Sequence, residues 1–232
     1  LMVIKNIVLV PWMWIKLCYH AKHTEKYTEE EQYKMLRFIT LHANKGGNVK
    51  IDVHGVENLP KDNGFMFFPN HQGLYDVLAI IEACPRPFSV VAKKEIANIQ
   101  FLKQVFACMK AYMLDREDVR QAMQVIVHVT EEVKRGRNYL IFAEGTRSKN
   151  GNKVGEFEGG SFKSATKAKC PIVPVALIDS FKPFDTNTIN PVTVQVHFLE
   201  PIYYEEYQTM KTTEIAAEVK CRIQKVINEN IK

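Results

Sequence analysis

From residue 48 onward, short segments typical of β-strands alternate with segments typical of helices. The strand candidates are β-branched or aromatic and bounded by turn residues: 49–53, 65–68, 88–92, 111–114, 138–143, 172–178 and 192–198. The helix candidates, of which 118–135 and the last carry a clear apolar stripe, are 74–83, 96–108, 118–135, 160–168 and 213–229. This alternation predicts an α/β fold: a mostly parallel central sheet of about seven strands with helices on both faces.

The first 47 residues precede this pattern and predict a module of two helices. We therefore divide the chain into residues 1–47 and an α/β domain of residues 48–232. Residues 1–19 are almost entirely apolar, and Pro11 is expected to kink their helix or to start a new one. The second helix is expected to follow a capping box of Thr28 with Glu31 and to end at Gly46-Gly47.

The apolar N-terminal segment combines Trp12, Trp14 and Tyr19 with Lys5 and Lys16. These aromatic side chains favour the headgroup level of a bilayer. Two lysines in mid-bilayer would each cost about 2.5–3.5 kcal/mol, so we expect the segment to lie in the interface rather than to span. The protein would then sit as a monotopic or peripheral protein on the cytoplasmic face of the cell membrane. The alternative is a helix packed on the domain's own core.

The number and spacing of the cysteines and the net charge limit the kinds of site and partner to expect. The five cysteines are odd in number and far apart and include no CxxC pair, so we expect neither a disulfide framework nor a zinc site. We expect a reducing compartment and no cleavable signal peptide. The net charge of +5 is too weak to indicate nucleic acid as a partner. It suits an anionic lipid, a phosphate substrate or an acidic protein.

The segment NHQGLYD, residues 70–76, follows a predicted strand and precedes an apolar helix. In a regular helix His71 and Asp76 would lie about 140° apart, but in a strand–turn–helix the carboxylate can reach the imidazole. Such a pair can remove a proton from an alcohol, with Asp76 fixing the tautomer of His71. The alternative is a turn with His71 as a bystander and Asp76 complementing the helix dipole.

The segment FAEGTRS, residues 142–148, follows another predicted strand. Gly145 permits a tight turn, Thr146 offers a hydroxyl, and Arg147 offers a forked cation that suits phosphate. Lys93 and Arg116 stand at two further strand ends, within Lys93-Lys94-Glu95 and Leu114-Asp115-Arg116. Together these strand ends predict one basic pocket beside one general base. Taken singly, each segment also fits an ordinary polar turn or surface charge.

These segments, in this order and spacing, resemble the motifs of the glycerolipid acyltransferase family, above all its bacterial lysophosphatidic acid acyltransferases. The resemblance covers about residues 50 to 200 and includes NHxxxxD, the Lys93 segment, the Asp115-Arg116 block, FPEGTRS and a Val-Pro-Val strand at 173–175. Ala143 replaces the usual proline of FPEGTRS, a change that removes no functional group. The two-helix N-terminal module is also similar to that of bacterial members.

The resemblance implies transfer of a fatty acyl chain from acyl carrier protein or acyl-coenzyme A to lysophosphatidic acid at a phospholipid membrane surface. His71, oriented by Asp76, would act as general base in a direct attack without an acyl-enzyme, a metal or a bound cofactor. Lys93, Arg116 and Arg147 would hold the glycerol phosphate, while Glu144 and Gly145 shape the loop with Thr146. Backbone amides near the helix N-terminus would stabilise the oxyanion.

Three alternatives remain open at this point. A sister enzyme of the same family would acylate glycerol 3-phosphate or another lysolipid. A thioesterase would use water in place of the alcohol, although hydrolysis needs no cluster of cations at the strand ends. A non-catalytic lipid-binding protein would keep the basic patch but has no use for His71 with Asp76.

Overall fold

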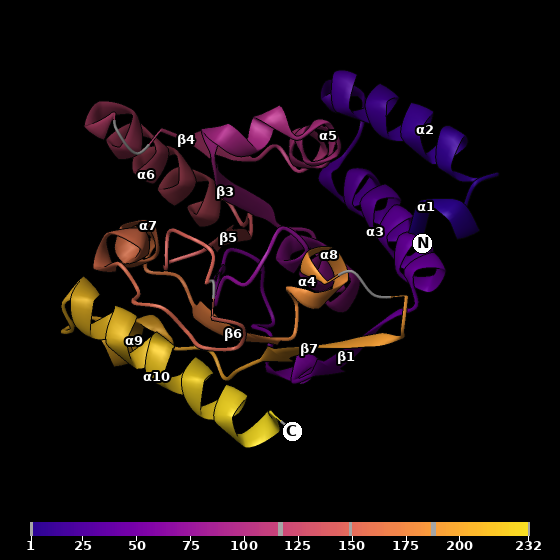
Figure 1. Cartoon of the computed structure of the whole chain (residues 1–232). Coiled ribbons are helices and arrows are strands. Elements are labelled where there is room, and N and C mark those ends of the chain that lie inside the picture. Colours follow the sequence, from indigo (N-terminus) through magenta and orange to yellow (C-terminus); the bar gives the residue numbers. More distant parts are fainter. Residues whose placement is uncertain (1, 116–117, 149, 187–188, 232) are drawn as a thin grey trace.

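The computed structural model describes residues 2–115, 118–148, 150–186 and 189–231. Its seven-stranded sheet has the spatial order β1-β7-β6-β2-β5-β3-β4 (Figure 1). Neighbouring strands are parallel except β6 and β7, which are antiparallel. The strands are β1 (Val49–His54), β2 (Met66–Pro69), β3 (Ser89–Lys93), β4 (Tyr112–Leu114), β5 (Tyr139–Ile141), β6 (Ile172–Ile178) and β7 (Val192–Phe198). The predicted mostly parallel sheet is confirmed.

Helices cover both faces of the sheet, as the sequence predicted. Residues from α2, α3, α4 and α5 form one hydrophobic cluster with the sheet, and residues from α6, α7 and α10 form a second. The helices are α1 (Met2–Lys5), α2 (Val10–Lys22), α3 (Glu29–Gly47), α4 (Asp76–Ala83), α5 (Gln100–Cys108), α6 (Val119–Lys134), α7 (Lys163–Ala168), α8 (Lys182–Asp185), α9 (Tyr204–Tyr207) and α10 (Thr212–Asn230). Four 3₁₀ segments connect them: η1 (Thr24–Lys26), η2 (Val56–Asn58), η3 (Lys94–Asn98) and η4 (Gly159–Phe162).

Strand β2 lies in the centre of the sheet and contributes side chains to the hydrophobic clusters on both of its faces. Successive side chains of a strand point to opposite faces. Phe67 accordingly joins the α2–α5 cluster, whereas Met66 and Phe68 join the α6–α10 cluster, and all three are fully buried. A run of large apolar residues without alternation is therefore what a central parallel strand requires.

The N-terminal helices α1, α2 and α3 lie on the same side of the sheet as α4 and α5 (Figure 1). Pro11 occupies the first turn of α2, so the apolar segment forms two helices rather than one kinked helix. Helix α2 buries Met13 and Leu17 in the common core, while its other side exposes Trp12, Trp14, Ile15 and Tyr19. Helix α3 begins with the predicted capping box and ends at Gly47.

No helix among the described residues combines the length and the apolar character that crossing a bilayer requires.

Candidate functional site

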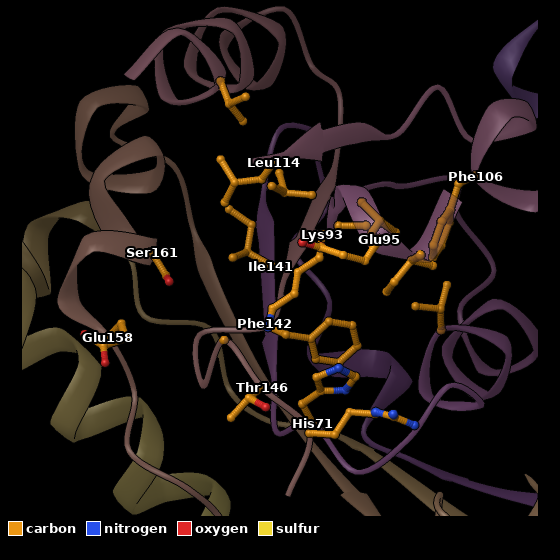
Figure 2. A pocket seen from close by; sticks show the side chains of 18 of the residues that line it. His71, Lys93, Glu95, Phe106, Leu114, Ile141, Phe142, Thr146, Glu158 and Ser161 are labelled. Carbon is orange, nitrogen blue, oxygen red and sulfur yellow. The ribbon is translucent and has the colours of Figure 1, made fainter. Parts of the chain in front are cut away.

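The order of the strands brings the predicted motifs to one edge of the sheet. Strands β2, β5, β3 and β4 are successive neighbours and run in parallel, so their carboxyl ends meet. His71 follows β2, Glu144 follows β5, and Lys93 ends β3. A cavity of about 610 Å³ opens at this edge and is lined by His71, Lys93, Gly145, Thr146 and Arg147 (Figure 2). The predicted meeting of these motifs in one pocket is present in the structure.

His71 and Asp76 form a hydrogen-bonded pair. Asp76 is the first residue of α4, is fully buried, and accepts a hydrogen bond from His71 Nδ1 at 2.7 Å through Oδ2. The same oxygen accepts the N–H groups of Gln72 at 2.7 Å and Gly73 at 3.0 Å. Because Asp76 serves as acceptor throughout, the proton of the neutral imidazole lies on Nδ1 and Nε2 is left as a base.

These contacts narrow one expectation about the oxyanion to amides other than those of Gln72 and Gly73. The sequence suggested that amides near the N-terminus of the helix stabilise the oxyanion. The amides of Gln72 and Gly73 instead donate to Asp76, so they are already occupied. Their function in this loop is to hold the Asp76 carboxylate, which in turn holds His71.

Glu144 fixes the backbone of the same loop. Its Oε1 accepts the N–H of His71 at 2.8 Å, and its Oε2 accepts the N–H of Gly155 at 2.9 Å. Burial raises the pKa of the Glu144 carboxyl, although these two hydrogen bonds oppose the effect. An added Cβ at Gly155 would come within 2.5 Å of Glu144 Oε2, so the glycine permits this close approach. Glu144 therefore positions the histidine loop rather than facing the cavity as a ligand.

Two further contacts orient His71 from the FAEGTRS segment. The ring of Phe142 stacks on the imidazole with the ring centroids 4.0 Å apart. The N–H of Ser148 donates to the His71 carbonyl at 2.7 Å. The imidazole is thus held at both its ring face and its backbone, and its side chain is only 14% exposed. Phe142 and Gly155 were not assigned a role from the sequence, because their contacts with the His71 loop depend on the fold.

The predicted cations behave differently from one another. Lys93 and Arg147 line the cavity, and neither side chain forms an ion pair or hydrogen bond with another described residue. Lys94, the next residue after Lys93, pairs with Asp115 at 2.5 Å and so links the ends of β3 and β4. Arg116 lies outside the described residues. Lys93 and Arg147 are therefore the two predicted cations that the structure places in the pocket.

The wall of the cavity toward α4 and α5 is apolar. It consists mainly of aliphatic and aromatic side chains, among them Val77, Ile96, Ile99, Leu102 and Phe106. Leu114, Val125, Ile126, Val129 and Ile141 extend this lining toward α6. A hydrocarbon chain is the ligand component that such a wall accommodates.

Side chains that commonly bind metal ions do not cluster in the described part of the chain. No three His, Cys, Asp or Glu side chains come together as metal ligands within residues 2–115, 118–148, 150–186 and 189–231. The five cysteines are all free thiols. The cavity offers a base, an apolar wall and two cations, Lys93 and Arg147, that have no partner in the described part of the chain.

Comparison with known proteins agrees with this site. The sequence profile of the acyltransferase family matches residues 50–178. The 1-acyl-sn-glycerol-3-phosphate acyltransferase of Borreliella burgdorferi is 31% identical over 172 residues, which are 72% of this chain and 68% of that protein. A chloroplastic 1-acyl-sn-glycerol-3-phosphate acyltransferase of Brassica napus is 32% identical over 158 residues, or 66% of this chain but only 45% of the plant protein.

A solved structure shares the fold. The crystal structure of the 1-acyl-sn-glycerophosphate acyltransferase from Thermotoga maritima superposes with a TM-score of 0.76, covering 99% of this chain and 97% of that one at 21% identity. The sequence profile covers more than half of the chain and includes both the His71–Asp76 pair and the FAEGTRS segment. The chain therefore belongs to the acyltransferase family.

Proposed function

We propose that the protein transfers a fatty acyl chain from an acyl thioester to the free hydroxyl of 1-acylglycerol 3-phosphate and so forms phosphatidic acid. The observation that carries the proposal is the His71–Asp76 pair, whose imidazole lines a cavity with an apolar wall. Lys93 and Arg147 line the same cavity, and neither has a partner among the described residues. The named activity of the Borreliella and Brassica relatives supports the same substrate.

The proposed reaction is a direct acyl transfer. His71 Nε2 accepts the proton of the acceptor hydroxyl as its oxygen attacks the thioester carbonyl carbon. The tetrahedral intermediate collapses with cleavage of the C–S bond, and the leaving thiolate takes the proton back from the imidazolium. Asp76 stabilises the imidazolium and keeps Nε2 directed at the acceptor. The donor is an acyl carrier protein thioester or a coenzyme A thioester.

The phosphate of the acceptor is assigned to Arg147 and Lys93. A guanidinium fork matches two phosphate oxygens with parallel hydrogen bonds, whereas an ammonium acts as a point charge. Both side chains line the same cavity as His71, and both are without a protein partner among the described residues. Arg116 was predicted as a third contact from the sequence and remains a candidate on that ground.

The exposed side of the N-terminal segment, α1, α2 and the turn between them, supports attachment to a membrane surface. Ile4, Val8, Trp12 and Ile15 are between 50% and 86% exposed, although they are large and apolar. The Lys16 ammonium lies 4.9 Å from the centre of the Trp12 ring. An apolar surface with tryptophan and lysine at its border is typical of helices that lie in the bilayer interface. We propose a peripheral position on the cytoplasmic face of the membrane.

The experiment measures thiol release by the purified protein with acyl-coenzyme A and with acyl carrier protein thioester. Each donor is combined with lysophosphatidate, glycerol 3-phosphate, lysophosphatidylcholine or no acceptor. Release that depends on lysophosphatidate, with phosphatidic acid identified by mass spectrometry, is the expected result. Thiol release without an acceptor would indicate a thioesterase. Release that depends on another acceptor would indicate a sister enzyme of the family. No release with any acceptor would indicate a lipid-binding protein.

A further inference from the structure

The cavity extends beyond the groups used so far. On the side of η4 and α7 it is lined by Glu158, Gly160, Ser161, Lys163 and Ser164, which we call the η4–α7 arm. Figure 2 shows Glu158 and Ser161 on the opposite side of the cavity from Phe106 and Glu95, with His71 between them. One end of the cavity is therefore lined mostly by apolar side chains, with Glu95 as an exception, and the other end carries polar groups.

The η4–α7 arm offers hydrogen-bonding groups and little bulk. The Glu158 carboxylate, the Ser161 hydroxyl and the Lys163 ammonium form no side-chain hydrogen bond or ion pair with any other part of the chain that the structure describes. A Cβ added to Gly160 would meet nothing within 4 Å, so the space in front of this backbone is open. The arm thus has room and free polar groups for a ligand.

The backbone of the arm is fixed on three sides. The N–H of Glu158 donates to the carbonyl of Ala143 at 2.9 Å, directly before Glu144. Gly159 packs against the start of α10, where an added Cβ would lie 3.0 Å from the Thr213 nitrogen. The ring of Phe162 stacks on Phe68 of β2 at 4.1 Å. Since β2 and β5 also hold His71 and Glu144, the arm keeps a set position relative to the base.

The chemistry of the substrates decides what the arm can hold. A phosphate dianion has no proton to donate and is repelled by a carboxylate, so a phosphate is disfavoured beside Glu158 itself and, within the arm, would lie at the Lys163 ammonium. The acceptor phosphate is already assigned to Arg147 and Lys93. A hydrocarbon chain would leave Glu158 and Ser161 without hydrogen bonds and belongs at the apolar end. The remaining component is the thiol portion of the donor. Its amide N–H and hydroxyl groups can donate to Glu158, and its amide carbonyls can accept from Ser161.

We propose that the η4–α7 arm binds the phosphopantetheine of the acyl donor. Glu158 and Ser161 form hydrogen bonds with its amide and hydroxyl groups, and the exposed Lys163 forms an ion pair with its phosphate. This component is common to coenzyme A and acyl carrier protein, so the inference does not depend on which donor the protein uses. It rests on the proposed acyl transfer and assigns the donor side of that reaction.

The test compares three donors with the same acyl chain: acyl-coenzyme A, acyl-4′-phosphopantetheine and acyl-pantetheine, which lacks the phosphate. Gly160→Leu places a side chain in the open space of the arm. It should raise the KM for all three donors by roughly tenfold or more and leave the KM for lysophosphatidate within about twofold. A rise in the KM for lysophosphatidate instead would overturn the assignment of the arm.

Lys163→Ala tests the phosphate contact without changing the shape of the arm. Its KM should rise roughly three- to tenfold for the two donors that contain phosphate and stay unchanged for acyl-pantetheine. Lys167→Ala removes an exposed lysine one turn further along α7, outside the cavity, and is the matched control. An equal effect of Lys163→Ala on all three donors, or none on any, would overturn the contact.

These outcomes separate the inference from the proposed function. If the wild-type protein releases no thiol in response to lysophosphatidate, the proposed acyl transfer fails. If the wild-type protein is active but both arm variants leave donor KM values unchanged, only the phosphopantetheine assignment fails. Circular dichroism and the unfolding midpoint of each variant establish that the arm variants are folded. Lys163→Ala decides the question if Gly160→Leu does not fold.

Discussion

At the scale of single residues, the site depends on a loop that is not helical where its histidine lies. His71 and Asp76 would diverge by about 140° in a continuous helix. Residues 70–73 have no regular secondary structure, and the helix starts only at Asp76. The three donors that converge on Asp76 Oδ2 define this loop more tightly than its sequence alone can. Removing the imidazole should therefore leave two of those contacts, and the fold, in place.

Arg147 gives a prediction about acceptor recognition. Replacing it by alanine should weaken the apparent affinity for lysophosphatidate by roughly tenfold, because a pair of charged hydrogen bonds to phosphate is lost. Arg147→Lys should recover only part of this loss. The measurement is the acceptor dependence of the rate, with the exposed Arg120→Ala as control. Unchanged affinity and turnover in Arg147→Ala would show that the phosphate binds elsewhere.

At the scale of elements, the sequence predicted the regular parts well and the short irregular parts poorly. All seven strands lie where turn residues bounded apolar runs, with ends shifted by two residues at most. The segments 96–108 and 160–168 were predicted as single helices, but each begins with a 3₁₀ segment, η3 and η4. Helices α8 and α9 have four residues each, too few to show a helical period.

The same limit explains which site residues the sequence revealed. His71, Asp76 and Arg147 belong to short motifs whose residue types and spacing indicate catalysis or phosphate binding, so the sequence alone identified them. Glu158 and Ser161 stand at the start of a segment predicted only as a helix, and their place beside the site depends on contacts with distant residues, such as the hydrogen bond of the Glu158 N–H to Ala143 and the stacking of Phe162 on Phe68. Contacts between residues that are distant in sequence leave no mark on local composition.

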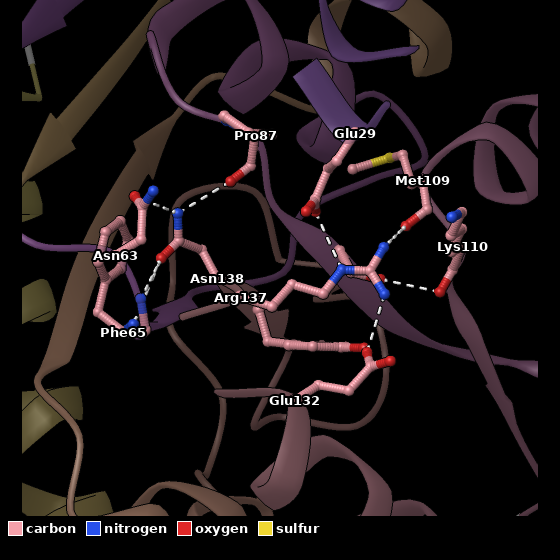
Figure 3. Close-up of polar contacts among 12 residues, drawn as sticks. Glu29, Asn63, Phe65, Pro87, Met109, Lys110, Glu132, Arg137 and Asn138 are labelled. Atoms are coloured by element: carbon pink, nitrogen blue, oxygen red, sulfur yellow. Dashed lines mark hydrogen bonds and ion pairs between the residues drawn. The ribbon is translucent and has the colours of Figure 1, made fainter. Parts of the chain in front are cut away.

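Arg137 links α3, α5, α6 and β5 through polar contacts (Figure 3). Arg137 is only 14% exposed, pairs with Glu29 at 3.0 Å and Glu132 at 2.8 Å, and donates to the Met109 carbonyl at 3.1 Å. Arg137→Met should lower the free energy of unfolding by about 2 kcal/mol, because partly buried carboxylates lose their partner. Urea denaturation measures the effect.

Arg135→Met is the matched control for this prediction, since Arg135 is exposed and forms no side-chain ion pair with any described residue. It should change the free energy of unfolding by less than about 0.5 kcal/mol. Equal values for the two variants would contradict the connecting role of Arg137.

Strands β1 and β7 contribute a pH dependence of stability. Burial, together with the nearby His54, lowers the pKa of His197 from 6.5 to about 4. Between these values the unfolded chain binds a proton that the folded protein does not bind. The free energy of unfolding should therefore fall as the pH is lowered from about 6.5 to about 4, by at most about 3 kcal/mol.

His197→Gln should flatten this dependence, as measured by urea denaturation across the same pH range. The exposed His128→Gln controls for the loss of an imidazole elsewhere. A pH dependence as steep in His197→Gln as in the wild-type protein would contradict the assignment to His197.

At the scale of the whole molecule, one side of helix α2 packs on the core and its other side is exposed and apolar. The sequence suggested either core packing or a position in the membrane interface, and the two sides suit one each. Met13 and Leu17 are core residues, whereas Val8, Trp12 and Ile15 face away from the core. Deleting the whole segment would expose the core, so substitutions on the outer side give the cleaner test. The triple variant Val8→Ser, Trp12→Ser, Ile15→Ser should bind anionic phospholipid vesicles at least roughly tenfold more weakly and keep its fold.

Vesicle co-sedimentation measures this binding, and circular dichroism checks the fold. Ile189→Ser removes an apolar side chain that is 74% exposed but lies outside the N-terminal helices, so it serves as the control. Equal sedimentation of the triple variant and the wild-type protein would remove the interfacial assignment.

The central claim is that His71 is the general base of acyl transfer to lysophosphatidate. Its most direct test is the rate of lysophosphatidate-dependent thiol release by the wild-type protein and by His71→Ala, with circular dichroism and the unfolding midpoint as folding controls. The account predicts a folded variant whose turnover falls by roughly 10²–10⁴-fold. Near-normal turnover in a folded His71→Ala protein would contradict it.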